Sequence, residues 1–213
     1  MSTEVAKRAG RPTDAAKRAA ILRAATESFF ASGYDGTSIE QVAASANVSK
    51  VTVYNHFTDK KGLFAASVES ECARMSEQFR VTPDLSGTLK QRLTAIGEAM
   101  MAFLSRDEMV QFERRIAAET EREPSIGEAF LACGPHRMKA EFASLMRAMV
   151  DAGEVRIEDI DLAVEQFAAM CKGMGDLERR FGAPQDPVRN RERITGAVEV
   201  FCRAYAVGDC DRK

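Results

Sequence analysis

The sequence has 213 residues, of which 45% are hydrophobic and 29% are charged, and its net charge is −2. This composition is typical of a globular protein of one or two domains. Because no apolar run reaches 18 residues, the sequence excludes a protein that spans a membrane through helices. The opening MSTEVAKRAGRP lacks the apolar stretch of a secretory signal. We therefore expect a cytoplasmic protein that has no membrane partner.

The charge is unevenly distributed along the chain. Residues 1–61 carry nine Lys or Arg and six Asp or Glu, a net charge of +3, and the remaining residues carry −5. A basic segment can approach phosphate groups, whereas an acidic one is repelled by them. Any nucleic-acid surface is therefore predicted in the first 61 residues.

Cysteine and histidine are too few and too dispersed to predict a metal site. The five cysteines are an odd number without C-x-x-C spacing, and there are two histidines. The pattern predicts neither a disulfide framework nor a zinc site, and no cofactor. We interpret Cys171 and Cys202 as small buried hydrophobes, and a redox-sensing role for Cys210 is the alternative.

Residues 1–12 are predicted to form a flexible basic arm, because a glycine and a proline break any helix there. Whether this arm contacts DNA or is a solvated tail is left open. Thr13 or Asp14 can cap a first helix that extends to about residue 32. Apolar residues spaced by four give this helix one inward face, and Gly33 ends it.

The next segment, TSIEQVAASANVSK, predicts a short helix and a tight turn. Two capping boxes are possible, one beginning at Thr37 and the other at Ser38. Asn47 suits the left-handed turn position that follows. Ser49 can then cap a second short helix that ends at about residue 57.

The rest of the chain is predicted to be helical. Asp59 can cap a long helix that Pro83 stops, and Ser105 with Glu108 forms a capping box further on. Later helices are expected at about 86–104, 105–122, 135–151, 159–181 and 187–207. The predicted fold class is all-α, with a three-helix N-terminal domain over residues 13–58 and a helical body over residues 59–213.

Two short helices that follow a longer one form the outline of a helix-turn-helix. The second short helix would display hydroxyl, ammonium and imidazole groups, carried by Ser49, Lys50, Thr52, Tyr54 and His56. Such a helix lies in the DNA major groove with its first residues on base edges. We therefore expect Thr52 to contact bases, and Tyr54, His56 and Lys60 to contact phosphates.

Residues 14–66 resemble the DNA-binding domain of the TetR family of bacterial transcriptional regulators. The motifs that carry the resemblance are F-x-x-x-G-Y-x-x-T-S, A-x-x-A-x-V-S-K, T-x-Y-x-H-F and K-x-x-L-F. Val51 and Asn47 depart from the family pattern, where small residues are common. The resemblance, with the outward positions of the second short helix, predicts DNA contacts by Thr37, Ser38, Ser49, Lys50, Val51, Thr52, Tyr54, Asn55, His56 and Lys60.

The resemblance also implies a homodimer, formed by the last two helices. The interface is then expected to include Phe167, Cys171, Met174, Val198, Phe201 and Tyr205, although the same stripe can serve as intramolecular core. A small-molecule pocket is implied among the middle helices, and methionine suits a cavity for varied apolar ligands. Its expected lining is Met100, Phe103, Phe112, Phe130, Phe142, Met146, Phe167 and Met170.

The predicted function is that of a homodimeric repressor, which binds a palindromic duplex operator and is released by a small, largely apolar effector. Residues 112–130 additionally resemble the C-terminal domain of AefR-like members. The alternative is a ligand-binding or protein-interaction module that has lost specific DNA binding. An enzyme is not expected, because the sequence shows no catalytic triad, metal cluster or phosphate-binding loop.

Overall fold

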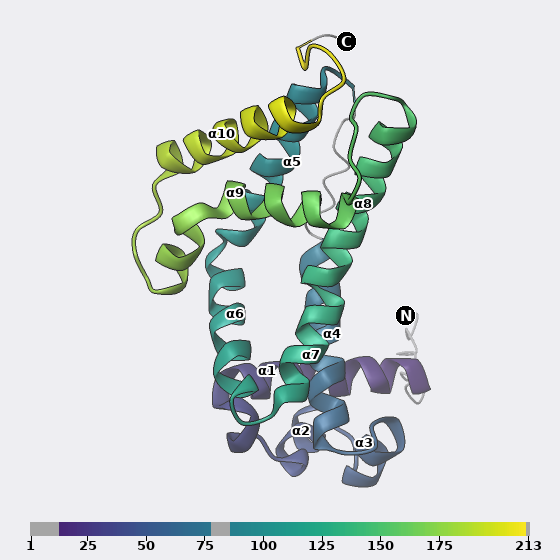
Figure 1. The fold of residues 1–213 in the computed structure, drawn as a ribbon. Coiled ribbons are helices and arrows are strands. Elements are labelled where there is room, and N and C mark those ends of the chain that lie inside the picture. The colour runs from purple at the N-terminus through teal and green to yellow at the C-terminus, as the bar shows by residue number, and fades with distance from the viewer. Residues whose placement is uncertain (1–12, 78–85, 212–213) are drawn as a thin grey trace, which may run out of the picture. The chain divides into compact units, whose positions relative to one another are not determined.

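The computed structural model describes residues 13–77 and 86–211, and their regular secondary structure consists of α-helices (Figure 1). Within these residues, the only β-type pairing is one antiparallel bridge between Val155 and Ala206. The all-α prediction is confirmed. The chain divides into two compact units, and the boundary in the sequence lies between Glu71 and Cys72. The predicted basic arm and the stop at Pro83 lie outside the described residues.

The first unit contains α1 (Asp14–Gly36), α2 (Ile39–Ser45), α3 (Lys50–His56) and the first turns of α4 (Lys60–Glu77). Thr13 caps α1, because its hydroxyl accepts the amide N–H of Ala16 at 3.2 Å. α1 is interrupted at Gly33, where φ is 76°. This is the residue at which the sequence predicts the helix end.

Aromatic rings hold the first unit together. Phe29 on α1 and Phe64 on α4 pack edge to face, with 4.7 Å between ring centroids. Tyr34 packs against both rings, at 6.0 and 5.4 Å. Burial of each large apolar side chain contributes about 1.5–3 kcal/mol. The fully buried aliphatic members of this core are Ile21, Val42, Val53, Leu63 and Val68.

The second unit contains the end of α4 and six further helices. They are α5 (Leu89–Leu104), α6 (Asp107–Thr120), α7 (Pro124–Cys133), α8 (Pro135–Asp151), α9 (Ile160–Arg180) and α10 (Pro187–Tyr205). Asp186 caps α10 as its proline-led start predicts. The predicted capping box at Ser105 is wrong. Ser105 instead ends α5, and α6 begins after Arg106 without a side-chain cap.

α9 lies at the centre of the second unit, where it packs against α10, α8 and α5. Figure 1 shows α9 and α10 side by side. Phe167 on α9 is fully buried, between Phe142 at 5.4 Å and Phe201 at 5.4 Å. Helix α5 approaches α10 closely because Gly97 on α5 lacks a side chain. A Cβ at this position would lie only 2.9 Å from Ile194 Cγ2 on α10.

α9 is not one continuous helix. Gly173 has φ 47° and ψ −147°, which interrupts the helix in a left-handed region that favours glycine. Beyond this break, the Arg179 guanidinium is buried between two carboxylates, with Nη1 2.7 Å from Glu113 and Nη2 2.7 Å from Asp176. α6 is therefore joined to the second half of α9 by buried charge.

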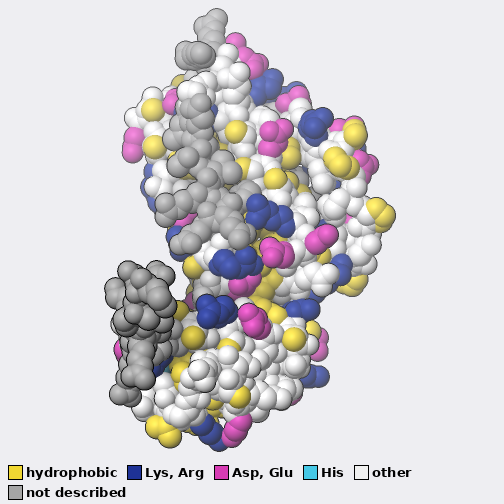
Figure 2. Space-filling model, turned by 180° about the vertical axis from the view of Figure 1, so that it is seen from behind, with side chains coloured by type: hydrophobic (Ala, Val, Ile, Leu, Met, Phe, Trp, Pro, Cys, Tyr) yellow, Lys and Arg dark blue, Asp and Glu magenta, His cyan; other side chains and the backbone are white. Residues whose placement is uncertain are grey.

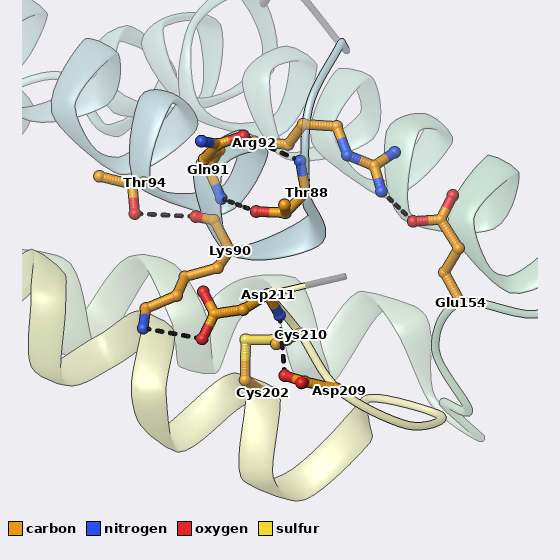
Figure 3. The surroundings of a disulfide bond; sticks show 10 residues. All are labelled: Thr88, Lys90, Gln91, Arg92, Thr94, Glu154, Cys202, Asp209, Cys210 and Asp211. Atoms are coloured by element: carbon orange, nitrogen blue, oxygen red, sulfur yellow. Dashed lines mark hydrogen bonds and ion pairs between the residues drawn. A yellow bond between two sulfur atoms is a disulfide. The ribbon is translucent and has the colours of Figure 1, made fainter. Parts of the chain in front are cut away.

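A disulfide joins Cys202 on α10 to Cys210 in the C-terminal tail (Figure 3). The tail is also held to the start of α5, where the Lys90 amide donates to the carbonyl of Cys210 at 3.3 Å. The expectation of no disulfide and of a buried Cys202 thiol is therefore wrong. The tail folds back over α10 and brings together two cysteines that the C-x-x-C criterion does not pair. Cys171, in contrast, is fully buried as predicted.

Surface charges of the two signs are mixed. On the face drawn in Figure 2, Lys and Arg side chains are interspersed with Asp and Glu. Exposed ion pairs such as Lys139–Glu165 and Arg137–Glu141 contribute little to stability, because solvent screens them. Among the helices described, none is long and apolar enough to cross a membrane.

Candidate nucleic-acid interface

Local capping orients the two short helices of the first unit. Ser38 caps α2 by accepting the Gln41 amide at 3.1 Å, and the Gln41 side chain accepts the Ser38 amide at 2.9 Å. Of the two predicted registers, the one beginning at Ser38 is confirmed. Asn47 turns the chain with φ 53°, and Ser49 caps α3. The predicted helix-turn-helix outline is therefore present.

α3 has one buried and one exposed face. Val53 is fully buried and Phe57, which follows the helix, is 6% exposed. Val51 is 67% exposed and Tyr54 is 44% exposed, and Asn55 is exposed beside them. An outward face with an aliphatic group, a phenol and an amide can contact base edges and backbone in a groove.

Lys50, at the start of α3, forms an ion pair with Glu40 on α2. Both side chains are exposed, and their hydrogen bond lowers the pKa of Glu40 and raises the pKa of Lys50. The Lys50 ammonium also lies 5.9 Å from the centroid of the Tyr54 ring. The predicted cation is therefore present on the exposed face, but an acidic neighbour neutralises it in the absence of DNA.

The hydroxyls of Thr52 and Ser49 are 2.8 Å apart and share a hydrogen bond. The Ser49 oxygen also accepts the Thr52 amide at 3.1 Å. This arrangement fixes the rotamer of the predicted base-contacting side chain. Thr52 is half-buried, so it offers a smaller contact area than Val51 or Tyr54.

His56 differs from its predicted outward position. Its side chain is 10% exposed, and its Nε2 lies 3.4 Å from the carboxylate of Asp14 on α1. The helix pattern of α3 alone does not reveal this neighbour, because Asp14 is 42 residues away in the sequence. A phosphate contact from His56 requires approach at the junction of α1 and α3 rather than on the open face of α3.

Thr37 and Lys60 also have partners within the first unit. Thr37 is 2% exposed, and its hydroxyl donates to the carbonyl of Gly33 at 2.9 Å. Ser38 is therefore the better placed of the two predicted phosphate contacts at this end. The Lys60 ammonium lies 4.5 Å from the centroid of the Tyr34 ring, which holds the charge at the start of α4.

Two family models match this chain. Residues 21–67 match the bacterial regulatory proteins of the tetR family, and residues 91–207 match the C-terminal domain of AefR-like transcriptional repressors. The second match covers more than half of the chain. The chain belongs to the TetR family. It is thus a TetR-type transcriptional regulator, as the resemblance predicted.

Two curated TetR-type regulators illustrate the extent of the likeness. The transcriptional activator FasR of Mycolicibacterium smegmatis is 28% identical over 120 residues, which is 55% of each chain. This match therefore spans about half the length of FasR. The transcriptional repressor AcnR of Corynebacterium diphtheriae is 22% identical over 189 residues, covering 83% of this chain and 93% of AcnR.

Solved TetR structures share the fold over nearly the whole chain. A protein assigned to the TetR family from Mesorhizobium loti is 30% identical with a TM-score of 0.78, covering 92% of this chain and all of that one. The flavonoid-responsive regulator FrrA is 26% identical with a TM-score of 0.81, covering 91% and 98%. Family and fold are those of transcriptional regulators.

The predicted pocket residues fall into two groups in this TetR body. Phe112 and Phe130 pack edge to face at 5.6 Å between α6 and α7, and Phe103 is buried near the end of α5. The others belong to the core around α9, and they are Met100, Phe142, Met146, Phe167 and Met170. The structure thus brings five of the eight together in one core cluster.

The predicted dimer residues require a correction. Phe167, Cys171, Val198 and Phe201 are at most 1% exposed within their own chain, so they cannot present a surface to a partner. Tyr205 is half-buried and donates to Gln166 at 3.2 Å. Of the predicted set, Met174 is exposed, at 61%. The four buried residues are intramolecular core, which was the alternative interpretation of the stripe.

Met174 is one of several exposed apolar side chains on α9, just after it, and on α10, and the others were not in the predicted interface. These side chains are Leu162, Met174, Leu177, Phe181, Val188 and Val200. An open depression of about 400 Å³ lies on α10 beside Val188, and Gly196 lines it with free space above its Cα. The signal was available, because Leu177 and Phe181 are spaced i, i+4 on the face opposite the core.

Proposed function

We propose that this chain is a homodimeric repressor that binds a palindromic operator and is released by a small, largely apolar effector. The observation that carries the DNA half is the exposed face of α3. It presents Lys50, Val51, Tyr54 and Asn55 outward while Val53 anchors the helix from behind. One such face offers few contacts, and a symmetric dimer doubles them on two half-sites.

The exposed apolar surface of α9 and α10 supports the dimer. Phe181 is 83% exposed and Val188 is 65% exposed, and Leu177 and Met174 lie nearby in the sequence. Large exposed apolar side chains that gather on two adjacent helices mark an association surface. Gly196 allows the backbone of a partner helix to approach closely. We therefore assign dimerisation to this surface in place of the buried stripe.

The proposed release by an apolar effector is supported by the composition of the core and by two comparisons. The core around α9 is rich in methionine and phenylalanine, which can repack around an apolar guest. The C-terminal match is to AefR-like repressors, and FrrA is described as responsive to flavonoids, which are aromatic compounds. We propose an apolar effector that binds one body conformation preferentially and lowers operator affinity by shifting the population.

Selection of the purified protein against random duplexes tests this proposal. The expected result is a palindromic consensus whose half-sites are bound by one dimer, together with loss of binding when the effector is added. The rival proposal is a ligand-binding or interaction module without specific DNA binding. Recovery of unrelated sequences would support that rival and overturn the operator proposal.

Two substitutions in the first unit are expected to affect DNA binding differently. Lys60→Ala should weaken binding to all duplexes and reduce the slope of log affinity against log salt by about one. Thr52→Ala should cost about 1–3 kcal/mol on the selected operator and relax its sequence preference, because it removes a base contact. Fluorescence anisotropy across a salt series measures both. Equal salt slopes for the two variants would contradict the assigned roles.

A further inference from the structure

A second cysteine pair lies in the second unit, apart from the disulfide. Cys72 is on α4 and Cys133 is the last residue of α7, and their sulfur atoms are 2.6 Å apart. A disulfide bond is about 2.05 Å long, so the two sulfurs need to approach by only about 0.5 Å. Sixty-one residues separate them in the sequence, and the fold brings them into contact.

The two thiols differ in exposure. Cys72 is 6% exposed, whereas Cys133 is half-buried at the turn between α7 and α8. The turn residue, Gly134, lies beside the pair, since a Cβ there would be 3.8 Å from the Cys72 sulfur, an ordinary contact distance. A solvent-borne oxidant therefore reaches Cys133 first, and Cys72 is placed to react with the product.

We propose that Cys72 and Cys133 form an oxidation-responsive dithiol that couples hydrogen peroxide, or a related peroxide, to operator binding. In the first step, Cys133–SH reacts with H₂O₂ to give the sulfenic acid Cys133–SOH and one water. In the second step, the Cys72 sulfur attacks this sulfur, the S–S bond forms, and a second water leaves with the Cys72 proton. The peroxide is reduced by two electrons, and the two thiols are oxidised to one disulfide.

The position of Cys72 on α4 is what connects this chemistry to DNA binding. α4 begins at Lys60, four residues after the end of α3, and Leu63 and Phe64 bury its first turns in the first unit. Cys72 follows Lys60 by twelve residues in the same helix. A covalent bond to α7 removes freedom from this helix, so it changes the set of first-unit positions that a bound operator can select. This step rests on the proposed DNA-binding function.

The other cysteines do not share this arrangement. Burial raises the pKa of the Cys171 thiol to about 12, so almost none of it is the reactive thiolate at neutral pH. Cys202 and Cys210 tie the C-terminal tail to α10. Cys72 and Cys133, in contrast, are two thiols in contact, one of them half-buried. This pair therefore has the features of a sensor, and the tail pair, which is already bonded, provides a matched control.

The full-length protein is reduced with dithiothreitol, desalted and treated with hydrogen peroxide, and then digested without reductant for mass spectrometry. The expected result is a linked peptide that contains Cys72 and Cys133. Affinity for the selected operator should change by about fivefold or more, the lower range of allosteric coupling, and dithiothreitol should restore it. Cys72→Ser and Cys133→Ser should each abolish the linked peptide and the affinity change.

The double variant Cys202→Ser, Cys210→Ser should keep both responses, since it removes a thiol pair that lies away from α4. Circular dichroism checks the fold of each variant, and the half-buried Cys133→Ser serves if Cys72→Ser fails to fold. Absence of the linked peptide, or an affinity change that survives in Cys133→Ser, would overturn the proposal. Equal operator affinity of the linked and reduced forms would overturn the coupling. If reduced protein binds no duplex, the proposed function fails, while peptide mapping still decides whether the dithiol forms.

Discussion

Arg179→Ala is expected to lower the free energy of unfolding by about 3–5 kcal/mol, the cost of breaking a buried ion pair from one side. The Arg179 side chain is 1% exposed, and both carboxylates that it binds are largely buried, at 13% exposed for Glu113 and 20% for Asp176. Burial alone would lower the pKa of Arg179, but its hydrogen bonds to Glu113 and Asp176 outweigh that effect and raise it. Truncation of Arg179 leaves the carboxylates of Glu113 and Asp176 with less positive charge to compensate them.

Arg180→Ala is the matched control for this prediction. Arg180 reaches the same two carboxylates, at 3.6 Å to Glu113 and 3.1 Å to Asp176, but its side chain is 47% exposed. Its loss should cost at most about 1 kcal/mol, because solvent screens such pairs. Urea denaturation followed by circular dichroism measures both values. Similar costs for the two variants would show that burial does not set the strength of this cluster.

The double substitution Leu177→Asp, Phe181→Asp is expected to convert the protein to a monomer and to weaken operator binding by about 100-fold or more. The loss is large because dimerisation links two DNA-binding domains. Linking two binding modules in general raises the overall affinity by about 10²–10⁴-fold. Leu177 is 50% exposed and Phe181 is 83% exposed, so the change adds charge to the surface and leaves the core intact.

Sedimentation velocity gives the oligomeric state, and anisotropy with the selected operator gives the affinity. Leu131→Asp is the control, since Leu131 is 44% exposed on α7, a helix that packs mainly against α6 and α8. It should leave both measurements unchanged. A double variant that stays dimeric would exclude this surface as the interface, and the proposed assignment would then be wrong.

Local signals predicted most of the helices and the DNA-reading segment. Caps at Thr13, Ser38, Ser49 and Asp186 depend on residues three positions apart at most, so they can be recognised in the sequence. The register of Val53 on α3 follows from the helical period in the same way. These features were predicted because each one is decided within one or two turns of chain.

Features that depend on distant residues were not predicted. The partner of His56 is on another helix, and the Cys202–Cys210 bond depends on how the tail folds back. Met174 was assigned to the dimer interface in one stripe with Phe167 and Cys171. The break at Gly173 ends that period, so Met174 is exposed while the other two are buried. Periodicity cannot reveal where a glycine will interrupt a helix.

The break at Gly173 also divides α9 into two parts that tolerate different amino-acid substitutions during evolution. Residues before it are constrained by the volume of the core, as the fully buried Phe167 illustrates. Leu177 and Phe181, after it, lie on the surface that we assign to pairing, and substitutions at these two exposed positions do not require the core to be repacked. In a cell that contains several related regulators, these exposed positions can diverge to prevent mixed pairs while the fold stays unchanged.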